Sequence, residues 1–177
     1  FLDKATISGK GYFAGVDVTI QKKNSGKGSF STVSYSFSKS EFLALRGDIQ
    51  PAEFDYGNQL MMIAGYRFEN GLSFSGRFKF AKGRPYTPYD ISKSTIYNGI
   101  YDSEMYNKAR MPDYGRLDLR VDYQVNLGNT VLTTYLEVLN VLDRVNYYNY
   151  YWSSYYKGVH ANLQLPRVPI IGISYKF

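Results

Sequence analysis

The stretch RLDLRVDYQV, residues 116–125, alternates apolar and polar side chains at every position. Successive side chains of an extended chain point to opposite sides, so a period of two divides the residues between two faces. One face carries Leu117, Leu119, Val121, Tyr123 and Val125, and the other carries Asp118, Arg120, Asp122 and Gln124. A helix would spread both sets around its circumference. The stretch therefore predicts a strand between a polar medium and an apolar one, which is either a protein core or lipid.

The composition of the 177-residue chain suits such a boundary. It contains 19 Tyr and 11 Phe, and Tyr combines an apolar ring with a polar tip. No apolar run approaches the ~18–20 residues of a transmembrane helix, which excludes a helical membrane protein and leaves a β-barrel open. Cysteine is absent, so no disulfide stabilises the chain. The net charge of +6 is dispersed along the sequence, and we therefore expect no nucleic-acid partner.

The same alternation recurs along the chain and predicts further strands. Together with the opening stretch it gives seven, at residues 12–22, 28–39, 58–68, 72–80, 114–126, 130–142 and 168–177. In this register we expect no strand to place a charge on its apolar face. Both a strand against lipid and a strand against a protein core would avoid such a charge, so this feature does not choose between them.

Short and long connections alternate between these strands. The short ones are residues 23–27, 69–71 and 127–129, and the long ones are residues 40–57, 81–113 and 143–167. Asn70-Gly71 favours a type I′ turn, which has two positive-φ positions. All turns then lie on one side of the sheet and all long loops on the other, which is typical of outer-membrane barrels. We therefore predict an all-β fold, an antiparallel up-and-down meander of about seven strands that forms part of a transmembrane β-barrel.

The number of strands indicates that this wall is incomplete. Closed single-chain bacterial barrels have an even number of strands, eight or more. Residues 1–10 also lack the basic start and apolar stretch of a signal peptide, so we expect the native N-terminus to lie further upstream. An eighth strand within residues 1–9 or 143–167 is the alternative.

Several motifs carry a resemblance to a known family. The chain ends in Gly172, Tyr175 and Phe177 at the spacing of the C-terminal barrel-assembly signal of outer-membrane β-barrels. The segment GRPYTP (residues 83–88) resembles the same segment of TonB-dependent outer-membrane receptors. NKARMPDYGRLDLRVDY (107–123), YLEVLNVLDRVN (135–146) and GKGYFAGVDVTIQK (9–22) are similar to strand segments of that family. These segments span nearly the whole chain, which therefore resembles the C-terminal part of the β-barrel of a TonB-dependent receptor.

The resemblance implies a barrel of roughly 22 strands with a plugged lumen, of which residues 1–177 would supply about the last third. It implies the bacterial outer membrane as the location. The implied partners are outer-membrane lipid, the remainder of the barrel with its plug domain, the TonB complex and the barrel-assembly machinery. The implied function is active uptake of a scarce ligand, either a metal chelate or an oligosaccharide. A small structural or adhesive outer-membrane barrel is the alternative, and an outer-membrane hydrolase is a third interpretation.

Catalytic motifs are not evident in the sequence. His160 is the one histidine, and no His/Cys/Asp cluster has the spacing of a zinc site. Ser153 and Ser154 lie near His160, but no orienting acid accompanies them. Glycine patterns that cradle phosphates are absent as well. We therefore expect neither an enzyme nor a cofactor.

One loop is unusually aromatic. YYNYYWSSYY, residues 147–156, contains Tyr147, Tyr148, Tyr150, Tyr151, Trp152, Tyr155 and Tyr156. These side chains are the candidate ligand contacts, as a stacking surface for a sugar ring or an aromatic chelate at the extracellular mouth. An interfacial aromatic girdle with loop self-packing is the favoured interpretation.

The polar faces of the strands offer a second set of candidates. The ionisable residues expected toward the lumen are Asp17, Arg67, Arg77, Lys79, Asp118, Arg120, Asp122 and Glu137. A ligand could contact them. We expect them instead to pair with one another and with the plug, because buried charges need partners.

Overall fold

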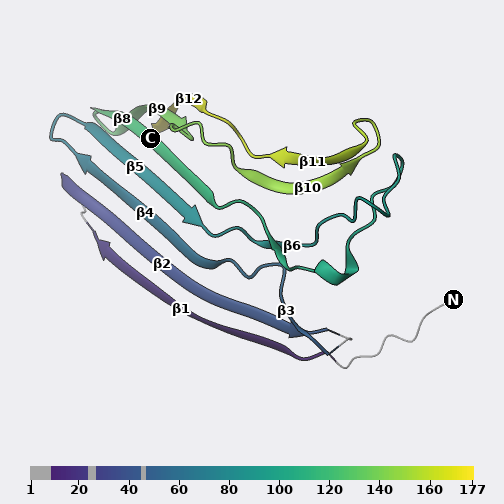
Figure 1. Ribbon diagram of the computed structural model, residues 1–177. Coiled ribbons are helices and arrows are strands. Elements are labelled where there is room, and N and C mark those ends of the chain that lie inside the picture. Colours follow the sequence, from purple (N-terminus) through teal and green to yellow (C-terminus); the bar gives the residue numbers. More distant parts are fainter. Residues whose placement is uncertain (1–8, 24–26, 45–46) are drawn as a thin grey trace.

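The computed structural model describes residues 9–23, 27–44 and 47–177, and these residues form an all-β fold (Figure 1). The main sheet is an open, curved antiparallel meander with the strand order β1-β2-β4-β5-β8-β9-β12. Its strands are β1 (Gly11–Lys22), β2 (Gly28–Leu43), β4 (Gly57–Arg67), β5 (Leu72–Ala81), β8 (Tyr114–Leu127), β9 (Thr130–Leu139) and β12 (Val168–Lys176). These seven strands confirm the predicted meander of about seven, and the short β3 (Ile49–Pro51), which pairs with the end of β2, is the eighth strand of the sheet. No helix in the described ranges has the length and apolar character needed to cross a bilayer.

Strand ends differ from the prediction where the backbone has a local reason to do so. β2 continues four residues past the predicted end at Lys39, because its last part also pairs with β3 (Ile49–Pro51). β9 ends at Leu139, three residues early, because Asn140 takes a φ of 52°, which leaves the extended region.

The hairpin between β4 and β5 corrects the predicted turn type. Gly71 has a φ of 84°, but Asn70 is not among the described residues with positive φ, so the turn is not type I′. The Phe68 amide donates to the Leu72 carbonyl at 2.8 Å, and this pair closes a three-residue loop. A single left-handed glycine at its end is usual for such a loop. Asn70 contributes through its side chain, whose Oδ1 accepts from the Leu72 amide at 3.1 Å.

The other two short turns have different outcomes. Residues 128–129 form a two-residue loop after Leu127, which pairs with Thr130, and Gly128 has a φ of 66°. The predicted turn at residues 23–27, with its Gly26, lies mostly outside the described residues.

The long connections carry small elements that the alternation did not predict. β6 (Pro85–Tyr86) pairs with β7 (Ala109–Arg110), and β10 (Tyr147–Ser153) pairs with β11 (Gly158–Leu163). A one-turn 3₁₀ helix, η1 (Ser103–Met105), precedes β7. The alternative of an eighth wall strand in residues 143–167 is therefore wrong. Two strands form there, but they make a separate two-stranded sheet outside the main one. The other location for that strand, residues 1–9, lies almost entirely outside the described residues.

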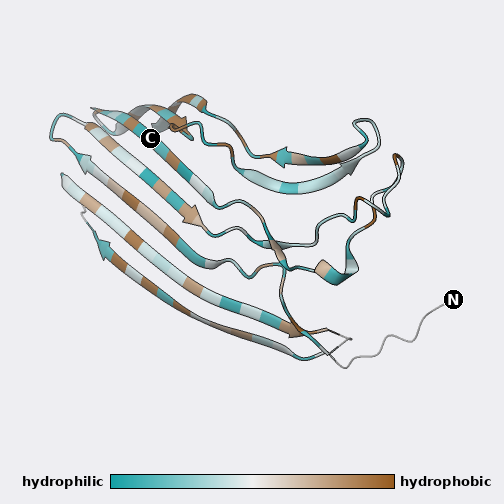
Figure 2. Cartoon of the chain, in the orientation of Figure 1, coloured by the Kyte–Doolittle hydropathy of each residue, from teal (hydrophilic) through white to brown (hydrophobic). Residues whose placement is uncertain are grey.

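One face of the main sheet is apolar across all seven strands. The register places Phe74 opposite Val121, and Val121 opposite Leu136, which in turn faces Ile171. The same face continues through Met62 and Val33 to Ile20 at the far edge. In Figure 2 brown bands alternate with white or teal ones along most strands of the sheet. Many of these side chains are exposed, and Ile171 retains 82% of its accessible surface. No described element covers this face, because the elements outside the main sheet lie in the long loops (Figure 1).

The opposite face carries paired charges. Asp118, only 4% exposed, accepts hydrogen bonds from Arg77 at 2.8 Å and from Arg116 at 2.6 Å. Arg120 pairs with Asp122 at 2.6 Å and with Glu137 at 3.4 Å. The expected mutual pairing of the polar-face charges is confirmed for these residues.

The expectation of a charge-free apolar face is wrong at the strand ends. Lys22, which pairs with Ser31, lies two residues after Ile20 and therefore on the same face. Lys39 and Glu41 lie two and four residues after Phe37 and share its face in the same way. Lys39 and Glu41 form an ion pair at 2.9 Å. These positions lie at the ends of β1 and β2, beyond the apolar middle of the sheet, where a charge can reach water.

Candidate functional site

The long loops gather at one end of the sheet, and the short turns lie at the other end (Figure 1). At the loop end, β6 and β10 come together although more than sixty residues separate them along the chain. The Arg84 guanidinium donates to the Tyr148 carbonyl at 3.2 Å, and the rings of Tyr86 and Tyr150 lie 5.1 Å apart. The predicted aromatic loop and the GRPYTP segment are therefore parts of one surface.

The GRPYTP segment is fixed by backbone contacts. A side chain at Gly83 would place its Cβ 1.6 Å from the Met111 carbonyl oxygen, so only glycine fits there. The Gly83 amide donates to Asp113 Oδ1 at 3.0 Å, and Lys82 pairs with the same carboxylate at 3.1 Å. These hydrogen bonds and the Lys82 charge hold the pKa of Asp113 below its ordinary value, the Gly83 amide being the largest cause. The Met111 amide donates to the Arg84 carbonyl at 3.0 Å, which adds a backbone hydrogen bond next to the pairing of β6 with β7.

A second anchor ties the β3–β4 connection to β7. The Arg110 guanidinium donates to the carbonyls of Asp55 and Gly83 and forms an ion pair with the Asp55 carboxylate. Asp55 is buried and also accepts from the Ser40 amide at 2.9 Å. Because three loop segments share these contacts, the backbone around β6 has little freedom to move.

Asn140 and Asn146 anchor the third loop. The buried Asn140 amide donates to Asp118 Oδ1 at 2.9 Å, while its side chain bonds the backbone of Arg144 in both directions. The Asn146 side chain accepts from the Gly115 amide and donates to the Gly115 carbonyl, at 2.9 Å each. These contacts give a physical role to both asparagines of the NVLDRVN segment, since each satisfies backbone groups that the end of a strand leaves unpaired.

The aromatic candidates divide into three groups instead of forming one stacking surface. In the first group, the Tyr150 ring packs against Tyr86 on one side and against Tyr147, with a centroid distance of 6.0 Å, on the other. Trp152 packs on Gly99 and on Tyr89, whose hydroxyl accepts from the Trp152 amide at 3.2 Å.

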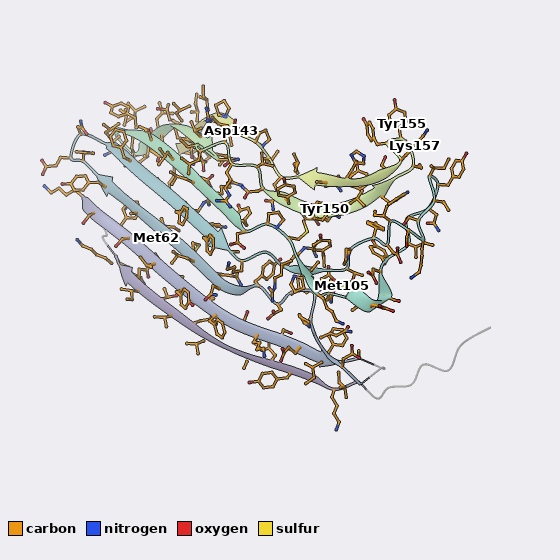
Figure 3. The ribbon with its side chains drawn as sticks, in the orientation of Figure 1. Met62, Met105, Asp143, Tyr150, Tyr155 and Lys157 are labelled. Carbon is orange, nitrogen blue, oxygen red and sulfur yellow. The ribbon has the colours of Figure 1, made fainter. Side chains whose placement is uncertain are left out.

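The third group lies toward the hairpin tip. Tyr151 and Tyr156 flank His160, and Tyr155 packs edge-on against Tyr156. Figure 3 shows Tyr155 and Lys157 at the tip of the β10–β11 hairpin, away from Tyr150. Tyr148 is largely exposed, and no described ring stacks on it. Their role as ligand contacts stays a prediction.

Tyr89 and Tyr101 form the most parallel ring pair at this end. Their centroids lie 4.4 Å apart with an angle of 19° between the rings, and the two hydroxyls are hydrogen-bonded at 3.0 Å. Burial, and then the Tyr101 hydroxyl, raise the pKa of Tyr89 to about 12. Neither residue was among the candidates, because they lie outside the aromatic run.

A pocket of about 370 Å³ opens between these loops. Its aromatic walls are Tyr86, Tyr101, Tyr106 and Tyr150, and its polar lining includes Glu53, Arg84, Thr87, Asn107 and Asn149. Of the seven sequence candidates, only Tyr150 lines it. The GRPYTP motif was the available signal for Arg84 and Tyr86. The sequence contains no signal for Glu53 or Tyr106, because only the folding of the loops brings these two residues to the pocket.

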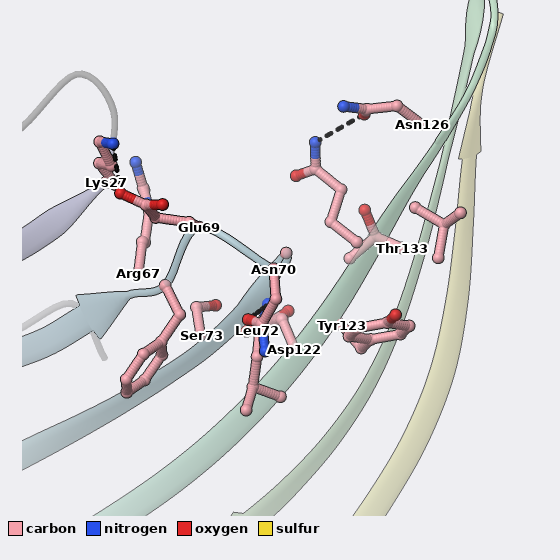
Figure 4. Close-up of a pocket in the computed structure, with 14 residues that line it drawn as sticks. Lys27, Arg67, Glu69, Asn70, Leu72, Ser73, Asp122, Tyr123, Asn126 and Thr133 are labelled. Atoms are coloured by element: carbon pink, nitrogen blue, oxygen red, sulfur yellow. Dashed lines mark hydrogen bonds and ion pairs between the residues drawn. The ribbon is translucent and has the colours of Figure 1, made fainter.

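A larger hollow of about 1020 Å³ lies at the turn end of the sheet (Figure 4). The β4–β5 turn and the end of β8 line it, and its lining residues include a Lys27–Glu69 ion pair and a Gln124–Asn126 hydrogen bond. Its lining is that of ordinary strand ends, with Phe68 and Tyr123 as its aromatic members. The loop-end pocket, where three tyrosines of the β5–β8 connection meet Tyr150 of β10, is the better candidate for a ligand site.

The C-terminal candidates lie on the last strand of the sheet. Gly172 faces the Tyr135 ring, and a Cβ there would lie 2.2 Å from Tyr135 Cζ. The Arg120 guanidinium covers that ring at 3.8 Å from its centroid. Tyr175 and Phe177 continue the apolar face, and Phe177 is 94% exposed. Their role as an assembly signal stays a prediction.

The described part of the chain contains no group of three or more His, Cys, Asp or Glu side chains that could hold a metal ion. No protein-family model matches this sequence, and no curated protein matches it. The fold and the loop-end pocket are therefore the observations on which a function can be argued.

Proposed function

We propose that this chain is the C-terminal part of the β-barrel of a TonB-dependent outer-membrane receptor, which takes up a scarce ligand across the bacterial outer membrane. The observation that carries the proposal is the two-sided sheet. An exposed apolar face runs over seven strands, and the opposite face carries ion pairs. Lipid would cover the first face and an aqueous, plugged lumen would meet the second.

The dimensions and connections support the same assignment. Six of the seven strands have 9 to 14 residues, and β2 has 16. About 9–11 tilted residues cross a bilayer, so each strand is long enough to span it. Short turns at one end and structured loops at the other match the periplasmic and extracellular sides of such barrels.

The open sheet favours a large barrel over the small structural or adhesive one. β1 and β12 are the two ends of the strand order and do not pair with each other. A closed barrel made from this sheet alone would bring them together as neighbours, and with seven strands that pairing would be parallel. Outer-membrane barrels of bacteria are antiparallel with an even number of strands, so further strands are needed.

The test uses the full-length gene product that contains this chain. After expression in its host, membranes are separated on a density gradient, and the extracted protein is passed over the immobilised periplasmic domain of the host TonB. We expect outer-membrane fractions, a mobility that changes on heating in SDS gels, and capture by TonB. Recovery in the soluble fraction or the inner membrane would contradict the proposal. Outer-membrane location without capture by TonB would favour the small barrel.

A further inference from the structure

We propose that the loop-end pocket binds an uncharged, hydroxyl-bearing ring ligand, such as one or two neutral sugar units, and discriminates against anionic metal chelates. This inference deepens the uptake function proposed above and rests on it for its biological meaning. It concerns the pocket walled by Tyr86, Tyr101, Tyr106 and Tyr150, whose volume of about 370 Å³ is at the lower end of the range for small-molecule sites.

The walls offer ring faces held at fixed angles. Tyr86 and Tyr150 pack on each other, with ring centroids 5.1 Å apart and 49° between their planes, and both rings line the pocket. Tyr101 is held from behind by its stacking on Tyr89. The anchors at Gly83 and Arg110 fix the backbone that carries Tyr86. A flat, partly apolar ring can therefore dock without ordering the site first, which lowers the entropic cost of binding.

The phenol hydroxyls supply matching hydrogen bonds. Tyr86, Tyr106 and Tyr150 have no hydroxyl partner among the described residues, and a phenol both donates and accepts. Burial, and then Tyr86 and Tyr147, raise the pKa of Tyr150, so its hydroxyl stays protonated and able to donate. Asn149 Oδ1 accepts from Asn162 at 2.7 Å, which leaves the Asn149 amide nitrogen as a further donor at the rim. Sugar hydroxyls have the same mixed donor and acceptor character.

The charges of the lining argue against an anionic ligand. Arg84 is the lining cation and Glu53 the lining anion, and they pair at 2.6 Å. Arg84 also donates to the Tyr148 carbonyl, so its guanidinium is already engaged on two sides. Binding an anionic chelate would require breaking the ion pair or placing the ligand charge beside Glu53, and complementary charge is what such recognition needs. A neutral ligand leaves the pair intact.

The test measures binding to the full-length protein purified from outer membranes in detergent. Titration calorimetry with neutral di- and trisaccharides of glucose, galactose and mannose is compared with ferric citrate as the anionic chelate. We expect at least one neutral saccharide to bind and ferric citrate not to bind. Tyr86→Ala and Tyr150→Ala should each weaken the saccharide Kd roughly tenfold, by removing one stacking face. Tyr97→Ala, which removes a loop tyrosine that is 82% exposed and outside the pocket, is the matched control and should leave Kd unchanged.

Tyr150→Phe keeps the ring and separates packing from hydrogen bonding. It should weaken Kd less than Tyr150→Ala, and heat-modifiable mobility on gels shows that each variant is folded. Binding of ferric citrate, no binding of any saccharide in the panel, or equal effects of Tyr97→Ala and Tyr150→Ala would overturn the inference. If the protein is found in the outer membrane and is captured by TonB, these binding results overturn only the ligand class, and the proposed uptake function stands. If the protein is neither in the outer membrane nor captured by TonB, the uptake function is overturned whatever the binding results are.

Discussion

At the level of single residues, three glycines of this chain face very different surroundings, and their replacement by alanine should have graded effects. A Cβ at Gly83 meets the Met111 backbone at 1.6 Å, which cannot move without unpairing β6 and β7. A Cβ at Gly172 meets the far end of the Tyr135 ring, which can rotate away at the cost of its contact with Arg120. A Cβ at Gly158 meets nothing within 4 Å. Gly83→Ala should therefore destabilise by about 2–3 kcal/mol, Gly172→Ala by about 1, and Gly158→Ala by less than about 0.5.

These glycine variants are compared in the full-length protein by the temperature at which its folded gel band is lost. Limited proteolysis of the loops gives a second readout. Cleavage near residues 83–111 should increase for Gly83→Ala alone, because only that variant disturbs the loop backbone. If Gly83→Ala and Gly158→Ala behaved alike, the close approach to Met111 would not exist in the folded protein.

Asp118 provides a second residue-scale prediction. Its carboxylate, buried on the polar face, holds Arg77 and Arg116 and accepts from the Asn140 amide. Asp118→Asn would leave two guanidinium groups without their shared counter-ion, and breaking a buried pair typically costs about 3–5 kcal/mol. Since the Arg77 side chain is 41% exposed and can be solvated by water, we expect Asp118→Asn to lower the free energy of unfolding by about 2–3 kcal/mol. The thermal loss of the folded band measures it. Asp17→Asn, on the exposed β1, is the control, and an equal loss of stability in both variants would contradict this role.

At the level of elements, β8 can report which face meets lipid. Val121 lies on the apolar face between Phe74 and Leu136, and Asp122 lies on the polar face opposite Ser73. Val121→Arg should impair membrane assembly strongly, because an arginine near the bilayer midplane costs about 2–4 kcal/mol. Asp122→Asn removes one ion-pair partner of Arg120 and should assemble nearly as well as wild type. Folding yield into lipid vesicles is measured for both in the full-length protein. Equal yields would mean that the faces are assigned wrongly.

The elements also show what sequence periodicity can and cannot predict. β8 was predictable because its apolar and polar residues alternate without interruption. β10 was not, because Tyr147–Ser153 places tyrosine on both sides and offers no contrast between faces. The two-residue strands β6 and β7 are too short for any period, and pairing across the loop creates them. The turn at Asn70-Gly71 was located correctly but assigned the wrong geometry, since a dipeptide does not reveal whether two or three residues form the loop.

At the level of the whole molecule, the candidate site was the feature least predictable from the sequence. The aromatic run supplied Tyr150, and the GRPYTP motif marked the segment that holds Arg84 and Tyr86. Their meeting depends on ion pairs and hydrogen bonds between loops, such as Arg110 with Asp55, that join residues 55 positions apart. Such contacts leave no periodic pattern, because each involves single residues in irregular backbone. The strands were predictable because their environment repeats every second residue.

The open sheet leads to a prediction for residues 1–177 in isolation. Among the described residues, β1 and β12 each present an edge without a neighbouring strand, and no described element covers the apolar face. Unpaired edges promote association, and exposed apolar patches of this kind require lipid, detergent or a partner. We therefore expect the isolated chain to aggregate in buffer and to become dispersed only in detergent, as size-exclusion chromatography with light scattering would show. The full-length protein in the same detergent is the control and should elute as one species. A monodisperse, detergent-free monomer of residues 1–177 would mean that the edges and the apolar face are satisfied within this chain, and that no further barrel strands are needed.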